Sequence, residues 1–574
     1  MIKKRILVLL LLFLCAAEQL FAQLHEGSVN LEKYVSYGPI LEPYRSFEEG
    51  LTFDPKKSSR VALLKWVEAT NPDNGNSLAN QQVFTGEAIV PEGWANDKIF
   101  LYIDAPKVPF ALEVNGIKLQ VSKIGVNTSI NLSPIIKEGA KSVTLKLIAK
   151  GQRQAITDLA QDFLLVARPA LALSSAYITS HLVYKGHYRG LTWTAGFRVQ
   201  NLSDTPLRWE YIRHETYVSS DVPPVRVRAD SLTPGHEPIQ PGAKSRWGVH
   251  HNKEMYTHFW TAETPNLLQV GHLQTSARYR IQEVVSHKIG VRVVEEKQGK
   301  LLVNGVPVKL NPVAFQHSSL SEKPASREEL EAFIIRLKQH NVNTLVVTGL
   351  PVNEDLYELA DTYGLYVIQK VEPSAASAAD PQLWLLQQTS MVYRIRNHPS
   401  LLAWQLGNST RKTEKEMLQA FADSLGNASS YRPHDLDPYR PVLFSSPLGM
   451  PKPVAGFDNL SDEAKKQLKQ QYQPLHIFLQ DTTAGKIVIR NLQGFAPLTN
   501  LGLDWEISDS TTILKQGSIQ DIQLTPQRAQ TIQLPLNGKE YLKSGKCLRI
   551  SVRLGKESAW ASQGHEVAWK TFCL

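Results

Sequence analysis

Strand-like and helix-like segments alternate in the middle of this 574-residue chain, between about residues 300 and 450. The helix-like "SREELEAFIIRLKQH" precedes the apolar "NTLVVTG", and the alternation continues through "NEDLYELADTY", "LYVIQ", "PQLWLLQQTSMVYRIRN" and "SLLAWQL". This pattern predicts parallel strands joined by crossover helices, either in a barrel or in a doubly wound sheet. It stops after about five strands and four helices, which is fewer than the eight units of a closed barrel.

Patterns typical of β-structure lie on both sides of this region. "KSVTLKLIAK" and "CLRISVRL" alternate apolar and polar residues with the period of half-buried strands. A chain of this length is expected to form several domains. The predicted fold class is therefore multidomain β plus α/β. Its parts are an N-terminal jelly-roll-like sandwich (23–170), an immunoglobulin-like sandwich (171–295), a partial (β/α) barrel (296–450), and a linker with a C-terminal immunoglobulin-like β-sandwich (451–574). The jelly-roll type and the choice of a barrel over a doubly wound sheet are implied by the family resemblance described below.

The amino terminus, residues 1–22, has the composition of a secretory signal peptide. Three basic residues precede an apolar run from Ile6 to Ala17, and small Ala22 offers a cleavage site. We therefore expect an exported protein, periplasmic or extracellular, with no membrane span, because no segment reaches the roughly 20 apolar residues that cross a bilayer. The net charge of +9 is scattered without a Lys/Arg block, so no nucleic-acid partner is expected.

Only two cysteines, Cys547 and Cys573, follow the signal peptide. They begin and end the last two predicted strands. If these strands form a hairpin in which Leu554 faces Glu566, the two cysteines lie directly opposite each other, at a separation that suits a disulfide. Two separate buried thiols are the alternative, since a slip of one residue would send the side chains to opposite faces.

Neither a metal site nor a cofactor is predicted. Two cysteines are too few for a zinc cluster. His250, His251 and His258 are close in sequence, but they lie in a β-rich region without a nearby run of carboxylates. We interpret them as surface histidines that bind no metal.

Several motifs occur in the order typical of one enzyme family. They are "GEAIVPEGW", "FALEVNG", "FWTAETPNLLQV", "GKLLVNGVPVKL", "LKQHNVNTL", "LYELADTYGLYVI", "IRNHPSLLAWQLGN" and "GHEVAWKTFCL". In these motifs the chain resembles the β-galactosidases of glycoside hydrolase family 2 over nearly its whole predicted mature length. The resemblance implies carbohydrate chemistry, with a glycan or a galactoside-like carbohydrate as the ligand.

The catalytic residues of that family are replaced. The resemblance places the family's acid/base glutamate directly after Asn408, where this chain has Ser409. A serine hydroxyl is too weak an acid for that step, and retaining glycosidases need two carboxyl groups roughly 5 Å apart. An Asn-Arg-His run of the family becomes residues 314–316, Ala-Phe-Gln, and an Asp-Glu pair becomes Gln369 and Lys370. The family nucleophile would lie in the missing half of the barrel, so no catalytic residue is assigned.

Three residues match family positions near the sugar: Asp162, Trp404 and Asn408. We predict them as sugar-binding residues, although a core position for Trp404 and a solvated loop for Asp162 are the alternatives. Glu372, just past the third predicted barrel strand, is a candidate for a relocated acid. Pro373 beside it favours a surface carboxylate instead.

Three functions remain open. The favoured one is a secreted β-galactosidase-like pseudoenzyme that binds a glycan or partner without cleaving it. The second is an active β-glycosidase with relocated carboxylates. The third is a structural interaction protein, in which the edges of the partial barrel, near "LNPVAF" and "PVLFSS", are covered by another domain, a protein partner or a second copy in a homo-oligomer.

Overall fold

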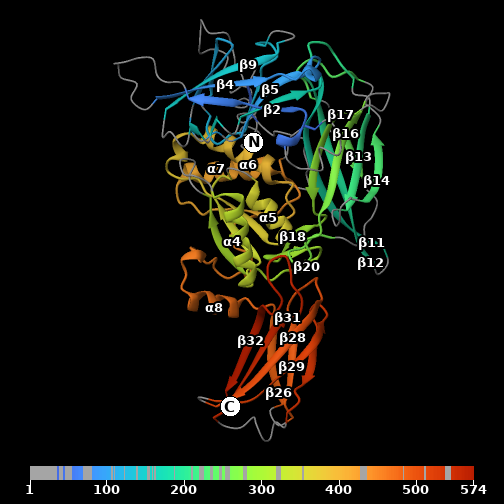
Figure 1. The fold of residues 1–574 in the computed structure, drawn as a ribbon, viewed down its shortest axis with the longest axis vertical. Coiled ribbons are helices and arrows are strands. Elements are labelled where there is room, and N and C mark those ends of the chain that lie inside the picture. Colours follow the sequence, from blue (N-terminus) through green and yellow to red (C-terminus); the bar gives the residue numbers. More distant parts are fainter. Residues whose placement is uncertain are drawn as a thin grey trace, which may run out of the picture.

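A computed structural model describes residues 35–573 of the chain, apart from gaps that include 38–42, 45–54, 69–80, 151–155, 219–224, 233–236, 252–258, 276–280, 318–324, 427–435 and 537–544. The predicted signal peptide and Asp162 lie outside the described residues. The α/β region lies in the middle of the molecule, with β-rich layers above and beside it and the C-terminal sandwich below (Figure 1). No helix in the part that the structure describes has the length and apolar character to cross a membrane.

The first β-region is a sandwich of two antiparallel five-stranded sheets. Apolar side chains of both sheets share one core, for example Leu101 with Leu112 and Leu145. One sheet has the order β1-β8-β5-β10-β2 and the other β3-β4-β9-β6-β7. The strands are β1 Val35–Tyr37, β2 Val61–Leu63, β3 Lys65–Glu68, β4 Gln81–Ile89, β5 Lys98–Ile103, β6 Phe110–Val114, β7 Ile117–Val121, β8 Thr128–Asn131, β9 Ser142–Lys150 and β10 Phe163–Arg168.

The second β-region also packs two antiparallel sheets together. Trp193 of one sheet and Val270 of the other belong to the same core. The sheet orders are β11-β12-β15 and β14-β13-β16-β17. The strands are β11 Leu171–Lys185, β12 Tyr188–Asn201, β13 Tyr211–Val218, β14 Val225–Leu232, β15 Gly248–His251, β16 Leu268–Thr275 and β17 Ile281–Ile289.

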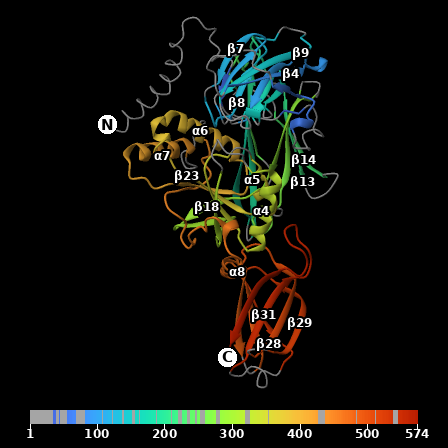
Figure 2. The ribbon, with the colours of Figure 1, turned by 60° about the vertical axis from the view of Figure 1, so that its left-hand side comes forward.

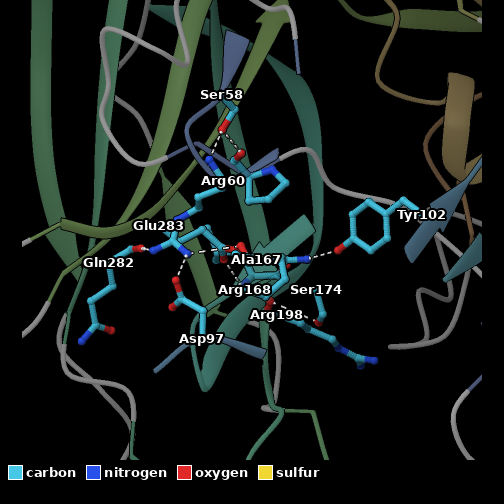
Figure 3. Close-up of polar contacts among 12 residues, drawn as sticks. Ser58, Arg60, Asp97, Tyr102, Ala167, Arg168, Ser174, Arg198, Gln282 and Glu283 are labelled. Carbon is cyan, nitrogen blue, oxygen red and sulfur yellow. Dashed lines mark hydrogen bonds and ion pairs between the residues drawn. The ribbon is translucent and has the colours of Figure 1, made fainter. Parts of the chain in front are cut away.

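A buried polar network joins these two sandwiches (Figure 3). The Arg168 guanidinium forms an ion pair with Glu283 of β17 and donates to the Tyr102 hydroxyl at 2.7 Å. The second Glu283 oxygen accepts the backbone N–H of Leu173 at 2.6 Å. Because each charged group is both buried and paired, the network fixes one sandwich against the other.

The α/β region contains one parallel sheet of five strands in the order β21-β22-β23-β24-β25. Strand order follows chain order, which is typical of a barrel, whereas a doubly wound sheet reverses direction at a switch point. The elements are β21 Pro312–Gln316, α4 Arg327–Gln339, β22 Thr344–Thr348, α5 Asp355–Tyr363, β23 Tyr366–Val371, α6 Pro381–Ile395, β24 Leu401–Leu406, α7 Lys412–Leu425 and β25 Val442–Leu443.

The two faces of this sheet pack against different partners. Helices α4 to α7 contribute to the core on one face, together with strand residues such as Val347 and Trp404. On the other face Val346, Ile368 and Ala403 share a core with a small antiparallel sheet: β18 Val294–Lys297, β19 Lys300–Val303 and β20 Val306–Pro307. A closed barrel would fill that inner face with its own strands. Here the small sheet covers it.

The chain itself covers one edge of the parallel sheet. Val454 forms a parallel bridge with Val313 of β21, and its carbonyl accepts the Ala314 N–H at 2.8 Å. The sequence predicts that the first sandwich, the C-terminal sandwich or a second chain covers this edge, whereas at β21 the structure shows a segment of the linker that follows the barrel region. After β25 the chain returns to the opposite edge, where it satisfies backbone groups that would otherwise be open.

Helix α8, Asp462–Gln471, leads into the C-terminal sandwich, which is visible at the bottom of Figures 1 and 2. Residues of its two sheets, such as Ile489 and Ile550, share one core. The sheet orders are β26-β27-β30 and β29-β28-β31-β32. The strands are β26 Leu475–Asp481, β27 Lys486–Asn491, β28 Leu498–Ser508, β29 Ile513–Leu524, β30 Ala529–Gln533, β31 Cys547–Leu554 and β32 Glu566–Cys573.

The last hairpin places Cys547 directly opposite Cys573 and joins them in a disulfide. The expected pairing of Leu554 with Glu566 is wrong, because Arg553 faces Glu566. A register shift next to Val552 separates this pair from the regular ladder that leads to the cysteines. An irregularity of this kind sets two residues of one strand against one of the other, and an alternation pattern does not reveal it.

Candidate functional site

A cavity of about 420 Å³ lies at the carboxyl ends of the parallel strands. This is the edge at which barrel folds place their active sites, because the loops after the strands meet there. Four successive strands or the residues just after them contribute to it. The lining residues are Gln316, Thr348, Gly349, Lys370, Glu372, Pro373, Ser374, Gly407, Asn408 and Ser409.

Strand β23 turns alternate side chains to opposite faces of the sheet. Gln369 is buried on the helical side, where its oxygen accepts the Tyr357 hydroxyl at 2.6 Å and its amide donates to the Gly349 carbonyl at 3.1 Å. Lys370 lines the cavity. Gln369 and Lys370 therefore have different surroundings, and of these two residues the lysine lines the cavity.

Glu372 is the carboxylate among the cavity's lining residues, and it forms an ion pair with the Lys370 ammonium. Both side chains are partly exposed. Gly407 lies against Glu372, and a Cβ atom at this position would be 2.3 Å from Glu372 Cγ. The lack of a side chain at Gly407 therefore allows the loop after β24 to approach Glu372 closely.

Ser409, for which the resemblance predicts the position of the family acid/base, belongs to a second polar group. Its hydroxyl donates to Glu414 Oε2, and the Arg411 backbone N–H donates to Ser409 Oγ at 3.1 Å. The Arg411 guanidinium donates to the other Glu414 oxygen at 3.3 Å. Ser409 therefore lies between the cavity and a carboxylate.

Glu414 is a residue that the sequence analysis missed. It lies in the first turn of α7, is buried, and is not among the residues that line the cavity. A carboxylate in the first turn of a helix usually serves the helix terminus, so its type and position gave no functional signal. The available signal was its spacing, five residues after Ser409, across a short loop.

The predicted sugar-binding residues have different surroundings. Asn408 is exposed and lines the cavity. Trp404 is fully buried on the helical face, where its indole N–H donates to Asp437 at 2.8 Å and its ring packs edge-on against Phe421. It is a core residue in this structure and does not line the cavity, contrary to the predicted sugar contact.

The amino end of β24 carries a buried charged cluster of a different kind. His398 Nδ1 lies 2.6 Å from Asp361 Oδ2, and His398 Nε2 lies 3.4 Å from Glu354. Burial disfavours the imidazolium, but the two carboxylates outweigh this effect and raise the pKa of His398 to about 10. The other Asp361 oxygen accepts the Ser400 N–H at 2.8 Å. This cluster fixes the start of the strand that ends at the cavity.

Comparison with known proteins supports the assignment of the central and C-terminal parts. Residues 294–480 match the TIM barrel domain of glycosyl hydrolases family 2, and residues 487–574 match domain 4 of β-galactosidase. The chain therefore contains a glycoside hydrolase family 2 barrel region, β-galactosidase-like in character, followed by a β-galactosidase domain 4.

Individual relatives agree with this result. The β-galactosidase of Priestia megaterium is 24% identical over 426 residues, which cover 55% of this chain and 41% of the relative. That of Photobacterium profundum is 33% identical over 196 residues, 32% of this chain and 18% of the relative. The chain thus spans less than half the length of these relatives.

Among solved structures, the β-D-mannosidase from Dictyoglomus thermophilum matches 86% of this chain and 82% of its own, with a TM-score of 0.53 and 11% identity. At this identity the likeness concerns the fold alone. It supports a multidomain β-rich protein with a parallel β/α region and β-sandwiches.

Proposed function

We propose that this protein is an exported, β-galactosidase-like carbohydrate-binding protein that holds a glycan in the cavity without hydrolysing it. The main support for this proposal is the set of residues that line the cavity. Among the described residues that line it, Glu372 is the carboxylate, and it is ion-paired with Lys370. Ser409 stands where the resemblance places the acid/base glutamate. Retaining hydrolysis requires two carboxyl groups that both reach the glycosidic bond.

The remaining lining supports a role in binding. The cavity is lined by amide, hydroxyl and ammonium groups. They belong to Gln316, Thr348, Lys370, Asn408 and Ser409. Such mixed donors and acceptors suit the hydroxyl groups of a sugar, which both donate and accept hydrogen bonds. The finer architecture that we propose is a jelly-roll-like sandwich, an immunoglobulin-like sandwich, a partial barrel and a C-terminal immunoglobulin-like sandwich.

Activity is tested with purified protein and nitrophenyl β-glycosides, alongside calorimetric titration with free β-glycosides. We expect binding and no turnover above background. Ser409→Glu should also be inactive, because the resemblance places the family nucleophile in the missing half of the barrel and Glu372, the carboxylate already in the cavity lining, is ion-paired with Lys370. Turnover that disappears in Glu372→Gln would overturn the proposal.

The second candidate function is that of an active glycosidase with relocated carboxylates. The observation that favours it is that two carboxylates contact the loop after β24: Glu372 lies against Gly407, and Glu414 accepts the Ser409 hydroxyl. Turnover by the natural protein that is lost in both Glu372→Gln and Glu414→Gln would establish this function instead.

A third function is protein interaction through the partial barrel, and fewer observations support it. Val454 covers the β21 edge, but Phe444 and Leu448, which follow β25, are 66% and 64% exposed. Light scattering tests it. If the natural protein and the Phe444→Ser variant both have the mass of a monomer, this result counts against self-association at this face.

Export is part of the proposal and is supported by the Cys547–Cys573 disulfide, since such bonds persist in oxidising compartments. Thiol titration of the unfolded, unreduced mature protein tests it. We expect no free thiol, and two free thiols per chain would contradict the expectation.

A further inference from the structure

The hydrogen bonds around Ser409 fix the direction in which its hydroxyl can interact with a ligand. A serine hydroxyl has one proton to donate and two lone pairs that accept. The proton is directed to Glu414 Oε2, and one lone pair receives the Arg411 backbone N–H at 3.1 Å. One lone pair remains, and Ser409 lines the cavity.

The Glu414 carboxylate holds this arrangement in place. An ionised carboxylate only accepts hydrogen bonds, so it imposes the donor role on the Ser409 hydroxyl. The Arg411 guanidinium donates to the other carboxylate oxygen at 3.3 Å, which fixes the orientation of the group. Glu414 is itself buried and does not line the cavity, so the ligand meets its influence only through Ser409.

We propose that Ser409, polarised by Glu414, is a specificity-determining residue that accepts a hydrogen bond from one hydroxyl of the bound sugar. The position that carries the proton donor in the family has become an obligatory acceptor in this chain. This inference rests on the proposed function, because it names the selectivity of the same site. Glu414 acts through Ser409 and is a positioning residue.

The test uses methyl β-galactosides in which each hydroxyl in turn is replaced by fluorine. Fluorine cannot donate a hydrogen bond, so the analogue substituted at the hydroxyl that faces Ser409 should bind about five-fold more weakly to the full-length protein. In Ser409→Ala this penalty should disappear, because the acceptor is gone. If Ser409 served only to hold the start of α7, its replacement by alanine would not abolish the penalty at one particular ligand hydroxyl.

Glu414→Gln provides a second, independent variant. Its amide oxygen would keep the contact with Arg411, so the amide nitrogen would face Ser409 and donate to it. The serine proton would then turn toward the cavity, so Ser409 would no longer have to accept from the ligand, and the fluorine penalty should shrink although the hydroxyl is still present. Thr410→Ala, an exposed neighbour outside the cavity lining, is the control and should keep the penalty.

The possible results separate the inference from the proposed function. If the parent galactoside binds but no fluorinated analogue is disfavoured, or if the penalty persists in Ser409→Ala, the inference is wrong while the proposed function stands. If calorimetry detects no binding of the parent galactoside or of any other free β-glycoside, both are wrong. Loss of the penalty in Ser409→Ala together with its retention in Thr410→Ala supports the inference.

Discussion

The two ends of strand β24 differ in how their polar groups are held. At the amino end, His398 and Asp361 form a buried ion pair whose remaining groups are also partnered. At the carboxyl end, Asn408 and Ser409 border an open cavity, and the Ser409 hydroxyl donates to Glu414. One motif thus has a beginning that stabilises the fold and an end that lines the cavity. Substitutions at the second end can therefore change the cavity without disturbing the first end.

The largest expected effect comes from breaking the amino-end cluster. Asp361→Ala leaves the buried His398 imidazolium without its principal partner and should lower the free energy of unfolding by about 3–5 kcal/mol. Urea denaturation of the full-length protein, followed through the transition of the α/β region, measures this free energy. Asp355→Ala, on the same helix but in a partly exposed ion pair with Arg327, is the control and should cost less than about 1 kcal/mol. Equal losses in the two variants would contradict the contrast between the ends of β24.

The same cluster predicts a dependence on pH. Because the pKa of His398 is raised from 6.5 to about 10 in the folded protein, its stabilising contribution is complete below pH 6.5 and is lost as the pH rises toward about 10. The stability difference between the natural protein and His398→Gln should therefore be largest near pH 6.5 and shrink by about 2 kcal/mol or more at higher pH. Denaturation curves of both proteins across this range measure it. A difference that grows with pH would mean that the imidazole is not held in its charged form.

At the carboxyl end of β24, a side chain added at Gly407 should lower both stability and ligand binding. Gly407→Ala would place a Cβ 2.3 Å from Glu372 Cγ, so Glu372 must move away from Lys370. We expect a loss of about 1–2 kcal/mol in stability and weaker ligand binding. The double variant Gly407→Ala with Glu372→Ala removes the clash and should regain most of the stability, although not the binding. If the double variant is no more stable than Gly407→Ala, the close contact does not limit this loop.

Much of the scaffold could be predicted from the sequence because its signals are local. Ser326 and Glu329, three residues apart in the Ser-x-x-Glu pattern, form a capping box at α4, and Gly364 ends α5 with a positive φ of 74°. "EVNG" forms a turn in which both Asn115 and Gly116 have positive φ. In each case, neighbouring residues determine the conformation.

The details of the site depend on contacts that the local sequence does not contain. Trp404 could face either side of a buried strand, and its place against Phe421 depends on where α7 packs. Glu414 reaches Ser409 only because the loop between them folds back. The cover of the β21 edge by Val454 likewise joins residues more than a hundred positions apart. Such contacts follow from tertiary packing, which overrides patterns along the chain.

The smallest expected change in stability tests the ligand-facing end most directly. Asn408 is exposed and lines the cavity, so Asn408→Ala removes no buried partner and should change the free energy of unfolding by less than about 0.5 kcal/mol. Its amide can both donate and accept, so its loss should weaken the binding of a β-galactoside several-fold. Calorimetric titration and urea denaturation of the same preparation measure the two quantities. Thr410→Ala should leave both unchanged, because this exposed neighbour lies outside the cavity lining. A variant at Asn408 that lost stability but kept binding would mean that this end of β24, like the other, serves the fold.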